Sequence, residues 1–245
     1  MGNVSVKNER FSKYLMYKLN KSKIEVDDLY TITEMTLNKN DFRNEVTDFE
    51  IDGIRYFKGL NKLYIKNFKI TSKLMREIAS IKNLKKIVFF SCDFEKSIKI
   101  NNKLDELQIL NCTNICNIKT VNTSYIKLSN VDIDFNVLKI LSNSSSIVLF
   151  NTFIGFDLGN NDSKYKNKKV VIKLKKSKDI KIIDSKINDN ILFKFKVLEN
   201  ISYINTPINE ELKVYIDKND KNKKINTILK DKYIEFTKEK GDANV

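Results

Sequence analysis

The nearest candidates for catalysis in this 245-residue chain are its three cysteines and two of its pairs of adjacent carboxylates. Cys92, Cys112 and Cys116 are candidate nucleophiles, and pairs such as Asp105–Glu106 and Asp27–Asp28 could do general acid–base work. A cysteine nucleophile needs a base beside it, and the chain contains no histidine. Adjacent residues of a strand face opposite sides, so the two carboxylates of one pair do not converge. We therefore predict no catalytic residues and expect a non-enzymatic protein.

The usual signatures of cofactor and metal sites are also missing from the sequence. It has neither a P-loop nor a G-x-G-x-x-G motif, and without histidine it lacks the commonest zinc ligand. We expect no cofactor and no metal. An odd number of cysteines does not make a disulfide framework. No apolar run approaches the roughly 18 residues of a membrane span, and the N-terminus has no apolar secretory stretch. We expect a cytoplasmic protein, with delivery to a host or to the cell surface left open.

The net charge of +14 could indicate a polyanion partner, because basic side chains neutralise phosphates. Only four of the 45 basic side chains are arginine, and the chain is also rich in asparagine and isoleucine. Lysine, asparagine and isoleucine share A/T-rich codons, so a low-GC genome accounts for much of the charge. The densest basic segment, residues 163–178, contains no acid. It is a candidate site for RNA or an anionic membrane through Lys164, Lys166, Lys168, Lys169, Lys173, Lys175, Lys176 and Lys178.

A repeated spacing indicates which elements organise the chain. The segment 104–114, LDELQILNCTN, has apolar residues at offsets 0, +3 and +5 and a cysteine at +8, which fits neither a helical stripe nor simple strand alternation. Similar segments recur at intervals of 28, 24, 20, 19, 21, 33 and 21 residues. Their position 0 is occupied in turn by Ile32, Leu60, Leu84, Leu104, Thr123, Ser144, Ser177 and Leu198.

This pattern resembles the leucine-rich repeat, whose signature is L-x-x-L-x-L-x-x-N/C-x-L. The resemblance implies an α/β fold: a right-handed solenoid, or horseshoe, with a parallel concave sheet and a mixed helical and extended convex side. In that family the residues at +3 and +5 point into the core, and the residue at +8 is buried where the chain turns. Residue types suited to position +8 are found at Asn40, Cys92, Cys112, Thr152, Ser185 and Thr206.

The resemblance covers residues 32–208, and each end of a repeat array needs a cap. Residues 1–31 are expected to form an N-terminal helical cap similar to that of internalin-type proteins, and 209–245 a C-terminal cap and tail. The good helix formers of segment 71–80 predict one convex helix. Shorter repeats have room only for extended or 3₁₀ segments, and 155–169 is read as an insertion followed by a backing strand at 170–174.

If +3 and +5 point inward, then +2, +4 and +6 must line the open face of the sheet. Apolar residues at these positions predict a contact surface for another protein. The candidate partner-binding residues are Tyr64, Val88, Phe90, Leu110, Tyr125, Val148, Phe150, Ile183 and Ile204. Amides dominate position +7 and would supply a polar rim. We therefore expect a monomeric protein-binding module, with the polyanion site of residues 163–178 as the alternative.

Overall fold

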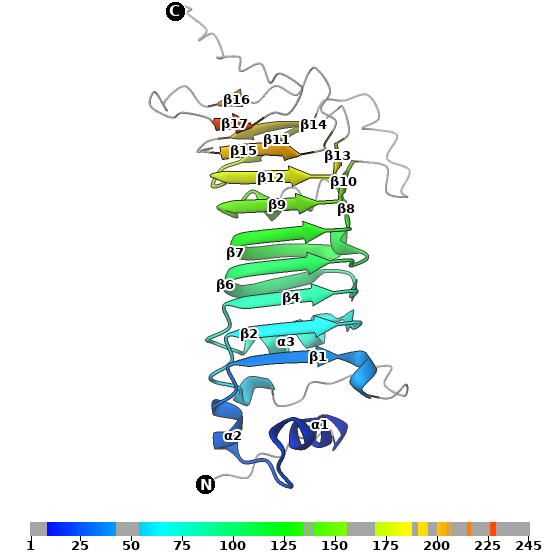
Figure 1. The fold of residues 1–245 in the computed structure, drawn as a ribbon, viewed down its shortest axis with the longest axis vertical. Helices are drawn as coiled ribbons and strands as arrows, with labels where there is room; N and C mark the ends of the chain where they lie inside the picture. The colour runs from blue at the N-terminus through cyan, green and yellow to red at the C-terminus, as the bar shows by residue number, and fades with distance from the viewer. Residues whose placement is uncertain are drawn as a thin grey trace, which may run out of the picture. The chain divides into compact units, whose positions relative to one another are not determined.

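A computed structural model describes residues 9–42, 54–134, 137, 140–155, 170–187, 191–195, 200–204, 206, 215–216 and 226–228. The chain is divided into two compact units: unit 1 is residues 1–122, and unit 2 is residues 123–245. Both are parallel β-solenoids, in which each short strand pairs side by side with the corresponding strand of the next repeat (Figure 1).

Unit 1 begins with helices and continues as successive strands. Its elements are α1 (Glu9–Leu19), α2 (Val26–Tyr30), β1 (Glu34–Asn38), η1 (Lys39–Phe42), η2 (Ile54–Tyr56), β2 (Lys62–Lys66), β3 (Lys69–Ile70), α3 (Ser72–Ala79), β4 (Lys86–Phe90), β5 (Asp93–Phe94), β6 (Ile98–Leu110) and η3 (Ile115–Asn117). The main sheet has the order β1-β2-β4-β6, with every pair parallel. A second, short pairing joins β3 to β5.

Unit 2 is built almost entirely from strands in its described part. Strand β7 (Ile118–Ser129) leads into it and is followed by β8 (Asp132–Ile133), β9 (Ser146–Phe150), β10 (Phe153–Ile154), β11 (Val170–Leu174), β12 (Asp179–Ile183), β13 (Lys186–Ile187), β14 (Ile191–Phe195), β15 (Asn200–Ile204), β16 (Tyr215–Ile216) and β17 (Asn226–Ile228). Its main sheet runs β7-β9-β12-β15-β17. The further sheets β8-β10-β13 and β11-β14-β16 are also parallel.

The repeat spacing sets the register of both main sheets. Leu63, at +3 of its repeat, pairs with Ile87, and Ile65, at +5, pairs with Phe89. Residues at +3 and +5 are buried in every repeat where their side chains are described. Because strand side chains alternate between faces, burial of these two positions turns +2, +4 and +6 to the other side. The predicted alternation is therefore confirmed.

An N-terminal helix covers the first strand, as the sequence predicts. Phe11 and Leu15 of α1 are buried, and the Phe11 ring lies 6.3 Å from that of Phe57. The hydroxyl of Tyr14 donates a 2.6 Å hydrogen bond to the carbonyl of Thr36 in β1. An uncovered edge strand would expose such groups to pairing with another chain, and α1 provides the cover.

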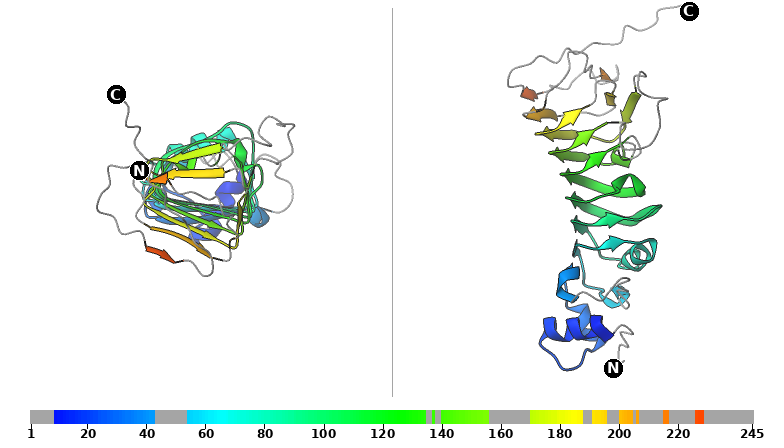
Figure 2. Two further views of the ribbon diagram at one scale, coloured as in Figure 1. Left: turned by 90° about the horizontal axis from the view of Figure 1, so that it is seen from above. Right: turned by 90° about the vertical axis from the view of Figure 1, so that its right-hand side faces the viewer.

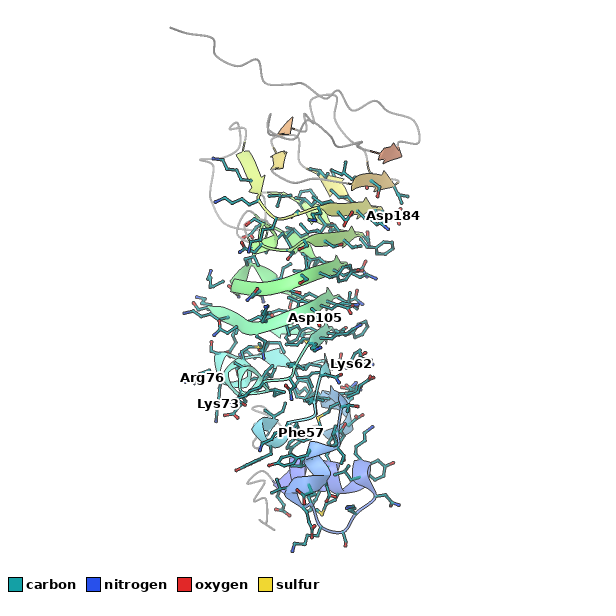
Figure 3. All side chains as sticks on the ribbon, turned by 90° about the vertical axis from the view of Figure 1, so that its left-hand side faces the viewer. Phe57, Lys62, Lys73, Arg76, Asp105 and Asp184 are labelled. Carbon is teal, nitrogen blue, oxygen red and sulfur yellow. The ribbon has the colours of Figure 1, made fainter. Side chains whose placement is uncertain are left out.

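The helix predicted at 71–80 is present as α3. Thr71 caps it, since its Oγ1 accepts a 3.1 Å hydrogen bond from the amide of Leu74. Leu74, Met75 and Ile78 are buried, while Lys73 and Arg76 project away from the side that carries Lys62 (Figure 3). Figure 2 shows α3 lying behind the strands of the main sheet. The extended first half of β6 lies beside α3, where Asn102 Nδ2 donates a 3.2 Å hydrogen bond to the carbonyl of Ile78.

The backing strand predicted at 170–174 is present as β11. It pairs with β14 rather than with a strand of the main sheet. The insertion at 155–169 lies outside the described residues except for Gly155, and so does most of the C-terminal segment 209–245.

Candidate functional site: the open face of the solenoid

The open face, as the term is used below, consists of the residues at +2, +4 and +6 of the main-sheet strands. Registers between neighbouring strands align these residues into three rows. Each unit carries its own part of the open face. Among the described residues, the large hydrophobic side chains with the greatest exposure are Tyr17, Phe90 and Ile204, and two of these three lie on the open face.

In unit 1 the apolar part of the open face is centred on two paired residues. Phe90 is 38% exposed and pairs with the partly exposed Leu110 of β6. Tyr64, at +4 of β2, is also partly exposed. The sequence predicted these three residues as surface, and they are accessible to a partner.

Val88 is a correction to the predicted binding residues of unit 1. It was expected on the open face, and its position in the register agrees, yet it is only 7% exposed. Its register partners on either side are Tyr64 and Gln108, whose side chains are longer. Neighbouring strands lie only about 4.8 Å apart, so Val88 packs closely between the side chains of Tyr64 and Gln108. Val88 therefore contributes to packing and not to a contact surface.

In unit 2 the row at +6 is the most apolar. Phe150, Ile183 and Ile204 pair across β9, β12 and β15. Ile204 is 46% exposed, and Phe150 and Ile183 are partly exposed. The remaining predicted residues of this unit, Tyr125 and Val148, are partly exposed as well. The five side chains predicted for unit 2 thus all reach the surface.

Charged side chains occupy the row at +2 in unit 1. Glu34 forms an ion pair with Lys62 at 3.5 Å, and Lys86 forms one with Glu106 at 3.0 Å. The hydrogen bond with Glu106 raises the pKa of Lys86 above its usual value. Gln108 Nε2 also donates to the Glu106 carboxylate. From the sequence, Glu106 was considered only as a candidate acid–base group, and this row was not predicted. Reading position +2 as a column would have found the sequence Glu, Lys, Lys, Glu.

The residues at +7 have a backbone role that the sequence analysis did not recognise. The following share a left-handed conformation, with φ between 46° and 64°: Asn67, Ser91, Asn111, Asn130, Asn151 and Asp184. Asparagine and aspartate tolerate this region better than other non-glycine residues. The turn that ends each strand therefore accounts for the amides at +7, whereas their role as an interface rim stays a prediction.

The polar residues at +8 form ladders between neighbouring repeats, as predicted. The amide of Cys92 donates to Cys112 Sγ at 3.3 Å, and the amide of Thr152 donates to Ser185 Oγ at 3.1 Å. In the same way, the backbone amide of Ser185 donates to Thr206 Oγ1 at 3.2 Å. These side chains satisfy backbone groups that the turn removes from the sheet.

Two of the predicted +8 residues are not buried. Thr206 is partly exposed, and Asn40 is exposed because the first repeat turns into the 3₁₀ helix η1 at this point.

Of the candidate catalytic groups, Cys92 and Cys112 lie next to each other in the +8 ladder. Cys92 and Cys112 are buried, and the hydrogen bond with Cys92, together with burial, raises the pKa of the Cys112 thiol. Asp105 is exposed, whereas Asp28 accepts hydrogen bonds from Lys21 and from the amide of Glu25. No group of three or more His, Cys, Asp or Glu residues that could hold a metal ion occurs in the described part of the chain.

Half of the predicted polyanion site can be located. Lys173, Lys175, Lys176 and Lys178 are exposed on β11 and in the segment that leads to β12. Lys164, Lys166, Lys168 and Lys169 lie outside the described residues.

Comparison with protein-family models found no match, and comparison with curated proteins found no similar sequence. None of the helices within the described ranges is long and apolar enough to cross a membrane.

Proposed function

We propose that the chain is a leucine-rich-repeat protein that binds a partner protein through the open face of its parallel sheets. Burial at +3 and +5, and at +8 in most repeats, supports the assignment to this repeat class, and the helices α1 and α2 before β1 agree with an internalin-like cap. Recognition would rest on a pre-formed surface, since residues already held in a sheet lose little conformational freedom on binding. The protein acts without catalysis or a cofactor in this proposal.

The observation that carries the proposal is the apolar row at +6. An open sheet face is normally polar, with apolar residues reserved for the buried face. Phe90 and Leu110 in unit 1, and Phe150, Ile183 and Ile204 in unit 2, depart from that rule in accessible positions. Contiguous exposed apolar residues of this kind usually mark contact surfaces, whereas single scattered ones do not.

The test compares partner capture by the wild-type chain and by a Phe90→Asp, Phe150→Asp double variant. The immobilised proteins are exposed to a lysate of the source organism, and bound proteins are identified by mass spectrometry. A Tyr17→Asp variant is the matched control, because Tyr17 is an 83% exposed aromatic residue on α1 and is not one of the strand residues that form the open face. A partner should be retained by the control and lost by the double variant.

Thermal unfolding separates loss of binding from loss of folding. Both replaced rings are accessible, so the double variant should unfold cooperatively near the wild-type temperature. Retention of every partner by a folded double variant would contradict the proposal.

A second candidate function, polyanion binding, is supported by the exposure of Lys173, Lys175, Lys176 and Lys178. A phosphate-driven contact should weaken steeply between about 50 and 200 mM salt, in proportion to the charges engaged. A salt-independent interaction that is lost on substitution of the open face would favour the protein-binding function instead.

A further inference from the structure

The apolar row of unit 2 has a defined spacing. Phe150, Ile183 and Ile204 are register partners on three consecutive strands, β9, β12 and β15. Neighbouring strands lie about 4.8 Å apart, so these side chains project at intervals of about 4.8 Å along a row about 10 Å long. The row crosses the strands and does not follow any one of them.

This spacing matches one kind of secondary structure in a partner. A helix lying along the row rises about 1.5 Å per residue, so residues i, i+3 and i+7 sit at about 0, 4.5 and 10.5 Å. An extended segment along the same row would present same-face side chains about 6.7 Å apart, and its third residue would miss Ile204 by about 4 Å. Only the helical partner places one apolar side chain against each strand.

The two sides of the row differ in charge. On one side of the row, at +4, Lys127 and Lys181 lie on the two strands that flank Val148. The two lysines are therefore two strand spacings apart, which is about the distance between residues i and i+7 of a helix. On the other side, at +7, Asp184 is exposed at the end of β12 (Figure 3). Asp179 lies at +2, beyond the lysines. A helix on the row therefore meets positive charge along one flank and an acid along the other.

We propose that unit 2 binds an amphipathic helix of its partner, laid across β9, β12 and β15 with an acidic flank toward Lys127 and Lys181. This inference rests on the proposed protein-binding function and specifies the partner's secondary structure and charge. Three apolar positions at 3–4-residue spacing fill the row. Two acids about seven residues apart on one flank complement the lysines, one opposite Lys181 at the middle strand β12 and one opposite Lys127, where the helix extends past β9 toward β7.

The experiment selects binders to the full chain from two phage-displayed peptide libraries. One library fixes a helical scaffold and randomises one face, and the other carries a central proline that prevents helix formation. Selected peptides are then synthesised and titrated by fluorescence anisotropy against the wild type and Ile204→Asp. They are also titrated against a Lys127→Glu, Lys181→Glu variant and against the Tyr17→Asp control.

The helical library should yield peptides with apolar residues at 3–4-residue spacing and acids on one flank. Ile204→Asp should weaken them at least about tenfold, and the lysine variant should weaken them severalfold. Exchanging the peptide's flanking acids for lysines should restore binding to the lysine variant. Tyr17→Asp should have no effect.

Two results would overturn the inference in distinguishable ways. Binders that come only from the proline library and depend on Ile204 would reject the helix but leave protein binding intact. If neither library yields a binder that depends on Ile204, both the helical partner and the proposed function of this face are rejected. Sedimentation adds one check: self-association of the chain that Ile204→Asp abolishes would assign the row to a second copy instead.

Discussion

The hydroxyl of Tyr14 donates a 2.6 Å hydrogen bond to the backbone carbonyl of Thr36 and so joins the N-terminal helix to the first strand. Tyr14 is 9% exposed, and the carbonyl it satisfies belongs to the outermost strand of the unit 1 sheet. The bond occupies part of an edge that would otherwise be available for strand pairing.

Removal of this hydroxyl tests the role of the cap. Tyr14→Phe should lower the free energy of unfolding by about 1 kcal/mol, because the Thr36 carbonyl loses its partner in a partly buried position. Urea denaturation measures the change. Tyr17→Phe is the control, because Tyr17 is 83% exposed, and its stability should match that of the wild type. Equal stability of Tyr14→Phe and the wild type would show that the contact does not stabilise the cap.

The same tyrosine predicts a loss of stability at alkaline pH. Burial, together with the charge of Asp41, raises the pKa of Tyr14 from 10.0 to about 12. A pKa raised by folding means that the unfolded chain ionises first, so the contribution of Tyr14 is complete below pH 10 and is lost as pH rises toward 12. The difference in unfolding free energy between wild type and Tyr14→Phe should therefore shrink across this range. A difference that stays constant would contradict the assignment.

The left-handed conformation of Ser91, where φ is 51°, predicts that two substitutions at this position change stability in opposite directions. Ser91→Gly should raise the unfolding free energy by roughly 0.5 kcal/mol, since glycine adopts this conformation without steric cost. Ser91→Val should lower it by about 1 kcal/mol or more, because a β-branched residue is strained at positive φ. Thermal unfolding of the two variants measures both effects. The same sign of change in both would show that the turn does not control stability here.

The three cysteines should differ in reactivity. Cys92 and Cys112 are 2% and 5% exposed, and the raised pKa of Cys112 further reduces its thiolate fraction. Brief treatment with iodoacetamide at pH 8, followed by peptide mass spectrometry, should label Cys116 first. Cys92 and Cys112 should react only after unfolding in urea, which is the positive control for labelling. Rapid native modification of Cys112 would mean that the +8 ladder opens readily.

The register of the sheets could be predicted from the sequence because it depends on local spacing. Leu63, Ile65, Ile87 and Phe89 are buried and paired as the offsets +3 and +5 require. The helix α3 was also predictable, because Thr71–Ser80 contains both a capping residue and an apolar stripe. These features need only the residue itself and its neighbours along the chain.

Exposure on the open face could not be predicted to the same degree, because it depends on neighbours across the sheet. Val88 and Phe90 are two residues apart and point to the same face, yet one is 7% and the other 38% exposed. Their neighbours across the sheet differ: Tyr64 and Gln108 lie beside Val88, whereas Lys66 and Leu110 lie beside Phe90. For the same reason the ion pair between Lys86 and Glu106, 20 residues apart, became visible only once the strands were paired.

The left-handed residue that closes most of these strands has a further consequence for how such a chain can change. In six repeats, the first ending at Asn67 and the last at Asp184, the residue with positive φ turns the backbone before the connecting segment begins. Insertions and deletions in the connections then leave the orientation of the strand side chains untouched, which agrees with repeat lengths that range from 19 to 33 residues. The connecting segments can therefore change in length and structure during evolution while the strand residues keep the faces to which they point.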